Sequence, residues 1–209
     1  MPRSLRFTLF ASVLAFGALT SCNKDEADGL KVQAHDKNAF MSIMHDMSKE
    51  MDMMTATMDP DNDYAKMMVM HHMGAIKMAQ KELSDGDNAT MKAIAQRVIT
   101  AQQAEITQFN AFLAGHPAHA PMVMEFMDRA MMVMEMMDKN NDLRVLTGDA
   151  DQDFAQLMID HHTSALEMSE DEIELGREAT PKAMARKIIT DQQMEIKELQ
   201  DWLLANKKY

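Results

Sequence analysis

The sequence predicts an all-α protein with a four-helix-bundle core, built from two duplicated helical hairpins and joined by two further Met-rich helices. Three observations support this. Residues 63–113 align with residues 153–203 without a gap, and 21 of the 51 aligned positions are identical. In both copies, apolar side chains recur every three or four residues, which is the period of an amphipathic helix. No stretch shows the alternation and β-branched content of a strand.

The N-terminal residues predict export and membrane attachment. Residues 1–21 hold a basic start, an apolar run too short to span a bilayer, and small residues before the single cysteine, Cys22. This is the pattern of a signal peptide. The Leu-Thr-Ser-Cys ending resembles a bacterial lipobox, which implies cleavage before Cys22 and lipidation of its thiol. An ordinary signal peptide and an uncleaved anchor helix are the alternatives.

Residues 22–36 are polar and lack an apolar period, so we expect a flexible tether after the lipidated cysteine. The protein is therefore expected in the bacterial cell envelope, held to a membrane by lipid on Cys22 and facing either the periplasm or the cell surface.

Helical periodicity then predicts six helices. Asp61 or Asp63 is expected to cap the second helix, with Pro60 just outside it. Gly86 and Gly176 fall where the hairpins turn, as glycine commonly does at a helix C-terminus. The helices are expected near residues 38–57, 62–84, 88–114, 122–140, 151–174 and 179–206.

The repeat sets the domain organisation. A first repeat over 37–115 and a second over 122–209 are separated by a linker at 116–121. We expect the four hairpin helices to form one bundle, with the two Met-rich helices packed on it. Two separate three-helix lobes are the alternative.

Net charge and methionine content limit the classes of function that this protein can have. The formal net charge is −12, which argues against nucleic-acid binding because phosphate contacts need a basic surface. The chain holds 26 methionines and only 5% aromatic residues, so methionine supplies much of the apolar volume. Methionine is flexible and specifies a core poorly, so its abundance indicates a second purpose.

The most informative motif is a His-His pair at the same place in each repeat. His71 and His161 share a helical stripe with methionines three residues before and seven residues after them, whereas the next residue of each pair points about 100° away. We predict two equivalent metal sites on these pairs. Their candidate ligands are Met68, His71, His72, Met78, Met158, His161, His162 and Met168.

Thioether and imidazole ligands suit a soft metal ion. This donor set favours Cu(I) and the similar Ag(I), or Cu(II), over magnesium, calcium or manganese. Polar residues of the following helix are placed to bond the second ring nitrogen and so orient each imidazole, as commonly occurs around metal-bound histidines. These residues are Gln102, Glu105, Gln192 and Glu195. The alternative is a metal-free buried pair in which His71 bonds Gln102.

Further methionines suggest additional, labile Cu(I) sites, although a Met stripe at helical spacing also serves as ordinary core. His116 and His119 form a His-x-x-His motif in the linker. This motif is a weaker candidate for a metal site, because a Pro-flanked loop is expected to be mobile. The extra candidates are Met41, Met44, His45, Met51, Met54, Met131, Met134 and Met137.

No enzyme motif is evident. The sequence has no Glu-x-x-His, His-Glu-x-x-His, Gly-x-Ser-x-Gly or P-loop pattern, so we expect a binding protein and not an enzyme. A Met-rich module that grips an apolar partner helix without metal is the main alternative, and a metalloenzyme is a weaker one.

The repeated Met-x-x-His-His-x-x-Ala-[Ile/Leu]-x-Met motif, followed by Gln-Gln-x-Glu-Ile, resembles the DUF305 family. The similarity covers residues 39–114 and 129–204. It implies ferritin-like packing and, as in CopM-like members, the binding of copper ions in the cell envelope. Copper efflux or copper oxidase proteins are the partners that such a role implies.

Overall fold

Six α-helices and one short 3-10 helix form within residues 31–206, the part of the chain described by this computed structural model. The expected signal peptide, Cys22 and most of the tether lie outside these residues. The elements are η1 (His35–Lys37), α1 (Ala39–Asp52), α2 (Pro60–Asp85), α3 (Ala89–Gly115), α4 (Met124–Asp142), α5 (Ala150–Leu175) and α6 (Ala179–Ala205).

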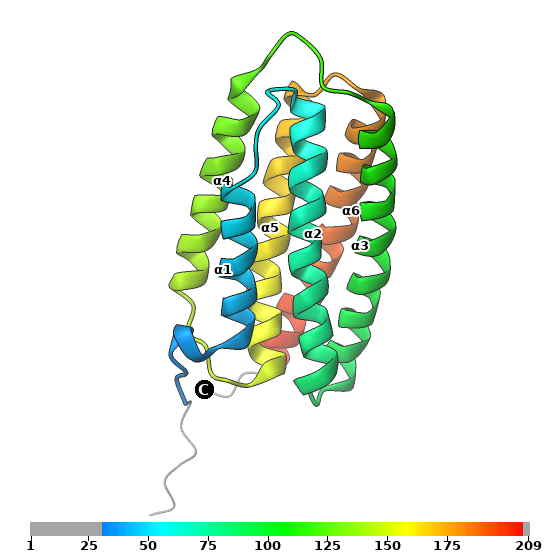
Figure 1. Cartoon of the computed structure of the whole chain (residues 1–209). Coiled ribbons are helices and arrows are strands. Elements are labelled where there is room, and N and C mark those ends of the chain that lie inside the picture. The colour runs from blue at the N-terminus through cyan, green and yellow to red at the C-terminus, as the bar shows by residue number, and fades with distance from the viewer. Residues whose placement is uncertain (1–30, 207–209) are drawn as a thin grey trace, which may run out of the picture.

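The helices stack in three layers of two. α2 and α5 form the middle layer, α3 and α6 cover one side of it, and α1 and α4 cover the other (Figure 1). Each hairpin packs closely within itself, and α2 and α5 then join the hairpins along their length. The two halves therefore share one core and are not two separate lobes.

The middle helices are buried on nearly every side, which explains why they carry buried polar groups as well as apolar ones. Asp61, Asp63 and Glu82 of α2 are each fully buried. Such groups need partners because an unpaired buried polar atom costs about 1–3 kcal/mol. Many of their partners come from the opposite half of the chain.

The first helix ends earlier than predicted. α1 stops at Asp52, whereas the sequence pattern extended it to residue 57. The carboxylate of Asp63 accepts hydrogen bonds from the amides of Thr57 and Met58, at 2.7 and 2.8 Å, and so holds the preceding segment as a loop. Met58 accordingly takes a positive φ of 61°.

The start of α2 also differs from the prediction. Asp59 is the N-cap, and its side chain accepts from the Asp61 amide at 3.2 Å. Pro60 is the first helical residue and does not lie outside the helix, a position that proline favours because no amide hydrogen is needed there. Asp63 shapes the loop, and Asp61 reaches across to the amides of Arg177 and Glu178.

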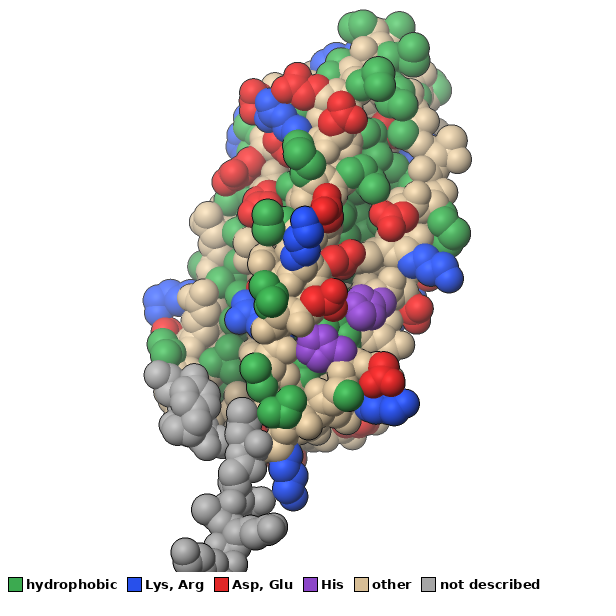
Figure 2. All heavy atoms as spheres, turned by 90° about the vertical axis from the view of Figure 1, so that its left-hand side faces the viewer, with side chains coloured by type: hydrophobic (Ala, Val, Ile, Leu, Met, Phe, Trp, Pro, Cys, Tyr) green, Lys and Arg blue, Asp and Glu red, His purple; other side chains and the backbone are tan. Residues whose placement is uncertain are grey.

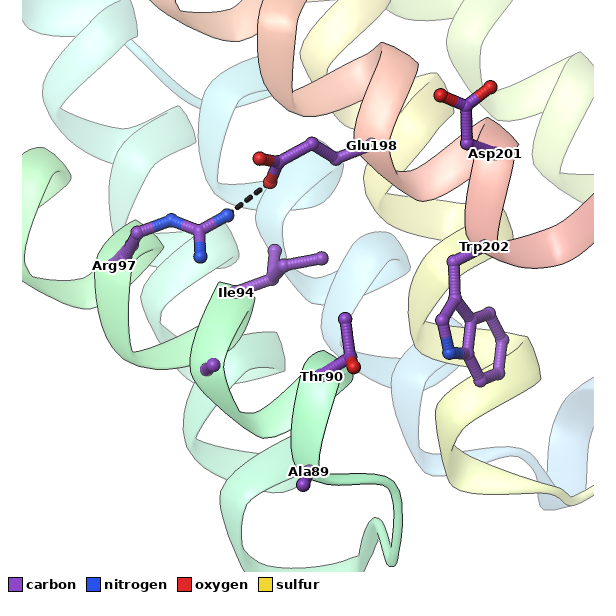
Figure 3. A pocket seen from close by; sticks show the side chains of 8 residues that line it. Ala89, Thr90, Ile94, Arg97, Glu198, Asp201 and Trp202 are labelled. Carbon is purple, nitrogen blue, oxygen red and sulfur yellow. Dashed lines mark hydrogen bonds and ion pairs between the residues drawn. The ribbon is translucent and has the colours of Figure 1, made fainter. Parts of the chain in front are cut away.

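A groove lies between α3 and α6 where the outer helices diverge. Ile94 and Trp202 line it, and an ion pair between Arg97 and Glu198 spans it (Figure 3). Its charged groups are already paired, because Asp201 also bonds Lys197, and they do not converge on a central point. Among the described helices, none combines the length and apolar character needed to cross a membrane.

Candidate metal centre

The two His-His pairs meet in the middle of the molecule, where α2 and α5 cross. The rings of His71 and His161 lie against each other, with centroids 3.7 Å apart and planes tilted by 33°. His72 and His162 flank this contact, with ring centroids 6.5 Å and 5.8 Å from those of their chain neighbours. All four side chains are fully buried.

The inner histidines are held by the facing helix. His161 Nε2 donates to the backbone carbonyl of His71 at 2.9 Å. His71 Nε2 lies 2.9 Å from the Ser164 hydroxyl oxygen, and that hydroxyl donates to the carbonyl of His161 at 2.8 Å. Because the serine proton is already used, His71 must be the donor to Ser164. Both rings therefore carry their hydrogen on Nε2.

The outer histidines are held by carboxylates from the outer layer. His72 Nε2 lies 2.9 Å from Glu105 Oε2 of α3, and His162 Nε2 lies 2.8 Å from Glu195 Oε2 of α6. A carboxylate can only accept, so each ring donates from Nε2. This arrangement fixes ring orientation and increases the basicity of the other nitrogen, as in carboxylate–histidine–metal sites.

The Nδ1 atoms of all four histidines are buried and have no hydrogen-bond partner among the described residues. Burial, together with the neighbouring imidazoles, lowers the pKa of His71 well below its usual value, and burial does the same for His161. These two rings are therefore neutral, with bare Nδ1 lone pairs. Each of these lone pairs is therefore available to a metal ion, although no three of the four histidines bring ligand atoms within 4.8 Å of one another in the described part of the chain.

Buried thioethers lie on the same helical stripes as His71 and His161. Met68, Met78, Met158 and Met168 have no exposed surface. In α2, Met68 lies one helical turn before His71, the spacing at which two side chains share one face. Met158 has the same relation to His161. The sequence placed these residues on the histidine stripe, and the structure puts all of them in the core.

Ser164 contributes to the centre but was not among the predicted residues. Met137 Sδ lies 3.2 Å from the Ser164 hydroxyl oxygen. Gly74 occupies the equivalent position in the first repeat, and a Cβ there would overlap Met47 Sδ. Met47 and Met137 are themselves equivalent in the repeat. A comparison of the aligned halves near the histidines would have given three candidate positions at which only the second repeat carries a polar side chain: Met70/Asp160, Met73/Thr163 and Gly74/Ser164.

The two candidate glutamines have a different environment from the glutamates. Gln102 and Gln192 are buried, but their side-chain amides have no hydrogen-bond partner within residues 31–206. The ring nitrogens are bonded instead by Glu105, Glu195, Ser164 and a backbone carbonyl. The alternative pairing of His71 with Gln102 is therefore absent from the described part of the chain.

The extra methionines divide into core and surface groups. Met41, Met44, Met51, Met134 and Met137 are buried, Met54 is half-buried, and Met131 is 37% exposed. His45 is exposed on the surface of α1, with Nε2 3.4 Å from Asp142 Oδ1. Most of these residues are thus core packing, and α4 carries four of the eight exposed methionines among the described residues.

The structure brings the two predicted sites together. The sequence places the His-His pairs 90 residues apart, but the contact between His71 and His161 joins them into one cluster. The halves are not equivalent there, because His161 bonds a carbonyl directly whereas His71 reaches the opposite carbonyl through Ser164. A change in one half is therefore expected to be felt in the other.

Fold and site together define a class of protein: an all-helical, two-repeat bundle with a buried histidine–methionine centre. The model of the family described as a domain of unknown function, DUF305, matches residues 17–113 and 114–203. The chain belongs to the DUF305 family.

Solved structures share this fold. CopM in its Cu(I)-bound form is 24% identical, with a TM-score of 0.53 over 69% of this chain and 96% of that one. CopM in an Ag-bound form obtained by soaking is 23% identical, with a TM-score of 0.52 over 70% and 96%. A DUF305 protein from Streptomyces coelicolor is 21% identical, with a TM-score of 0.57 over 72% and 95%. No curated protein matches the sequence.

Proposed function

We propose that this protein binds Cu(I), and the chemically similar Ag(I), at the buried histidine–methionine centre and thereby sequesters or transfers copper in the cell envelope. The observation that carries the proposal is the set of four buried Nδ1 atoms without hydrogen-bond partners, on rings whose Nε2 atoms are already bonded. CopM, which shares the fold, has been solved with Cu(I) and with Ag bound.

The chemistry of the donors favours Cu(I). Thioethers are soft, neutral ligands, and imidazole is borderline, a combination that suits Cu(I) and Ag(I) better than hard cations. A neutral donor set also avoids burying anionic ligands in the core. Glu105 and Glu195 act on the histidines and not on the metal, since each holds a ring N–H.

The proposed location follows from the sequence pattern around Cys22. Lipid on this cysteine would tether the bundle to a membrane, where copper efflux or copper oxidase proteins are suitable partners. Binding without turnover is the proposed activity. Retention of Cu(I) in air would support it, and steady oxidation of Cu(I) by oxygen would favour a metalloenzyme instead.

The decisive experiment is an anaerobic titration of the apo-protein against a coloured Cu(I) chelator. We expect wild-type protein to withdraw Cu(I) from the chelator, and replacement of all four histidines by alanine to abolish the competition. Glu105→Gln with Glu195→Gln keeps the rings but weakens their carboxylate bonds. This milder double variant should bind about 10–100-fold more weakly.

Glu198→Gln is the matched control, because it changes an exposed glutamate of the same helix as Glu195. Circular dichroism should show that each variant remains helical. Unchanged competition in both the alanine variant and the Glu105/Glu195 variant would end the proposal. His161→Ala alone tests the single-cluster geometry, since independent sites would leave half of the capacity intact.

A second role is favoured by the surface of α4. Met122, Met124, Met132 and Met136 are exposed on or beside this helix, and hydrophobic side chains run between acidic ones over the side of the molecule that carries it (Figure 2). Such a surface suits labile Cu(I) capture or docking of an apolar partner helix. Copper-independent peptide binding that survives the histidine changes would favour docking.

A further inference from the structure

A second group of metal-ligating side chains lies at the end of the bundle where α2 begins. Asp59, His116 and His119 each contribute one ligand atom, and these atoms lie within 4.8 Å of one another. Asp59 precedes His71 by twelve residues of helix, about 18 Å along the axis. The group is therefore separate from the histidine–methionine centre.

The two histidine rings of this group each direct one nitrogen toward the same oxygen of Asp59. Asp59 Oδ2 lies 2.8 Å from His119 Nδ1 and 3.9 Å from His116 Nε2. The other oxygen, Oδ1, is 3.1 Å from the Arg177 guanidinium. His116 Nε2 is buried and has no hydrogen-bond partner among the described residues. One ring nitrogen of this group thus has a free position facing a buried carboxylate.

The linker that carries the histidines is anchored, contrary to the expectation of a mobile loop. The His119 amide donates to Asp59 Oδ2 at 2.9 Å, and Asn62 Nδ2 donates to the His116 carbonyl at 3.2 Å. Arg177 donates to the carbonyls of Pro121 and His119, at 2.8 and 3.2 Å. These bonds hold both rings over the N-terminus of α2.

Packing orients the rings further. The His116 ring stacks on Phe112, with centroids 4.7 Å apart and planes 20° from parallel. His119 meets His116 edge-on at 4.8 Å. Asp59 is only 1% exposed, whereas the His119 side chain is 44% exposed. The group is therefore fixed on its inner side and open to solvent on its outer side.

We propose that Asp59, His116 and His119 bind a borderline divalent cation, Cu(II) in preference to Zn(II), with solvent completing the coordination. Two imidazoles and one carboxylate are borderline-to-hard donors, and no thioether belongs to the group, so its selectivity differs from that of the Cu(I) centre. Cu(II) precedes Zn(II) because it heads the affinity order of first-row divalent ions for nitrogen and oxygen sites.

Coordination requires one local rearrangement. Neighbouring ligands about 2.0–2.1 Å from an ion lie about 2.8–3.0 Å apart in the tetragonal geometry of Cu(II) and about 3.4 Å apart in the tetrahedral geometry of Zn(II). The 2.8 Å separation of Asp59 Oδ2 and His119 Nδ1 suits Cu(II), and the ion would replace the hydrogen bond between these two atoms. A neutral His119 ring can move its hydrogen to the outer nitrogen. Asp59 Oδ1 stays with Arg177, which leaves Oδ2 for the ion. The Arg177 charge opposes a cation and limits the affinity.

The second repeat lacks this group. Gln152 Nε2 donates to the Asn206 carbonyl at 3.0 Å, in the same way as Asn62 donates to His116. Asn206 therefore stands at the position equivalent to His116, and Tyr209 follows at the position equivalent to His119. Because neither equivalent position carries a histidine, we expect one such site among residues 31–206.

The test is to titrate the full chain, in its apo form, with Cu(II) and with Zn(II). Calorimetry measures the affinity for each ion, and electron paramagnetic resonance identifies the ligands of Cu(II). We expect nitrogen hyperfine structure from two imidazoles. His119→Gln and His116→Gln should each weaken this binding by at least about tenfold, the scale on which metal sites respond to damaged ligation. Cu(II) should bind more tightly than Zn(II).

His35→Gln is the matched control, because His35 is another solvent-accessible histidine beside a carboxylate, with Nδ1 3.8 Å from Asp142. It should leave Cu(II) binding unchanged. Equal Cu(II) affinity and spectra in wild type and His119→Gln would overturn the proposal, as would a loss confined to His35→Gln. Anaerobic Cu(I) competition should be unaffected by His119→Gln, so failure here and failure of the Cu(I) proposal are distinguishable.

Discussion

Two buried glutamates show how single residues shape the ends of the hairpins. Glu82 and Glu172 sit at equivalent places near the C-termini of α2 and α5, and each carboxyl group occupies the space that a Cβ of the following glycine would take. Gly86 and Gly176 have negative φ values, −65° and −63°. Glycine is therefore required by close approach, and not by a left-handed backbone as the helix-end pattern suggested.

Gly86→Ala is accordingly expected to destabilise the protein by about 1–3 kcal/mol, since the new methyl group would displace the buried Glu82 carboxyl. Thermal unfolding measures the effect. Gly115→Ala is the control, because a Cβ at this helix end meets nothing within 4 Å. Equal melting temperatures for the two variants would contradict this role of Gly86.

The loops before α2 and α5 show how equivalent elements use different residues. Asp153 accepts from the amides of Thr147 and Gly148, at 2.9 and 2.8 Å, just as Asp63 accepts from Thr57 and Met58. Gly148 has a φ of 76°, and Met58 adopts the same left-handed conformation in the first repeat. The aspartate at the fourth position of each helix therefore dictates the loop, and only one repeat carries a glycine, which adopts this conformation without strain.

Gly148→Ala should cost about 1–2 kcal/mol, the usual penalty for a side chain in the left-handed region. Met58→Gly should not destabilise the protein, because relief of that strain offsets the freedom gained by the unfolded chain. Chemical denaturation of both variants measures this difference. A stable Gly148→Ala protein with an unstable Met58→Gly protein would show that side-chain packing dominates at this loop.

At each end of the middle layer, a glutamate of one repeat lies beside an aspartate of the other repeat. These two acid pairs join α2 and α5 across the whole molecule. Glu82 interacts with Asp151, and Glu172 interacts with Asp61 in the equivalent way. Burial, helped by these aspartates, raises the pKa of Glu82 to about 8 and that of Glu172 to about 9. Two carboxylates can share a hydrogen bond only when one is protonated, so each glutamate keeps its proton at neutral pH.

This pairing makes stability depend on pH. Between the ordinary glutamate pKa and pH 8 to 9, the folded state holds protons that the unfolded state has lost, so stability falls as pH rises. We expect a loss on the order of 2 kcal/mol between pH 7 and pH 9. His71 and His161 are neutral in the folded and the unfolded state over this range, so they do not change the stability between pH 7 and pH 9. Their contribution to folding stability is lost only below about pH 6.5, where the unfolded histidines take up protons.

The measurement is the apo-protein melting temperature at pH 7 and pH 9. Glu82→Gln with Glu172→Gln should flatten the dependence, because the amide can still donate to the aspartate but does not ionise. A wild-type melting temperature that is the same at both pH values, or an equal fall in the double variant, would refute the assignment.

The gapless repeat and its helical period were enough to predict the helical class, the number of helices in the described chain and most of their ends. Local periodicity identifies the residues of a helix that face a core, whichever neighbouring helix packs against them. It failed at α1 because the Asp63 side chain captures the Thr57 and Met58 amides, a contact that overrides the Met stripe. Spacing alone likewise predicted that the buried histidines and methionines share a helical stripe that faces the core.

Tertiary structure alone decided how these pieces combine. A helical stripe does not specify what lies opposite, so only the crossing of α2 and α5 reveals that His71 and His161 touch and that Ser164 links them. The same holds for Asp59, which joins His116 and His119 from 57 and 60 residues away. The sequence by itself determined which donor atoms the protein offers. Long-range packing determined that they converge, because ligand geometry depends on distances that chain spacing does not encode.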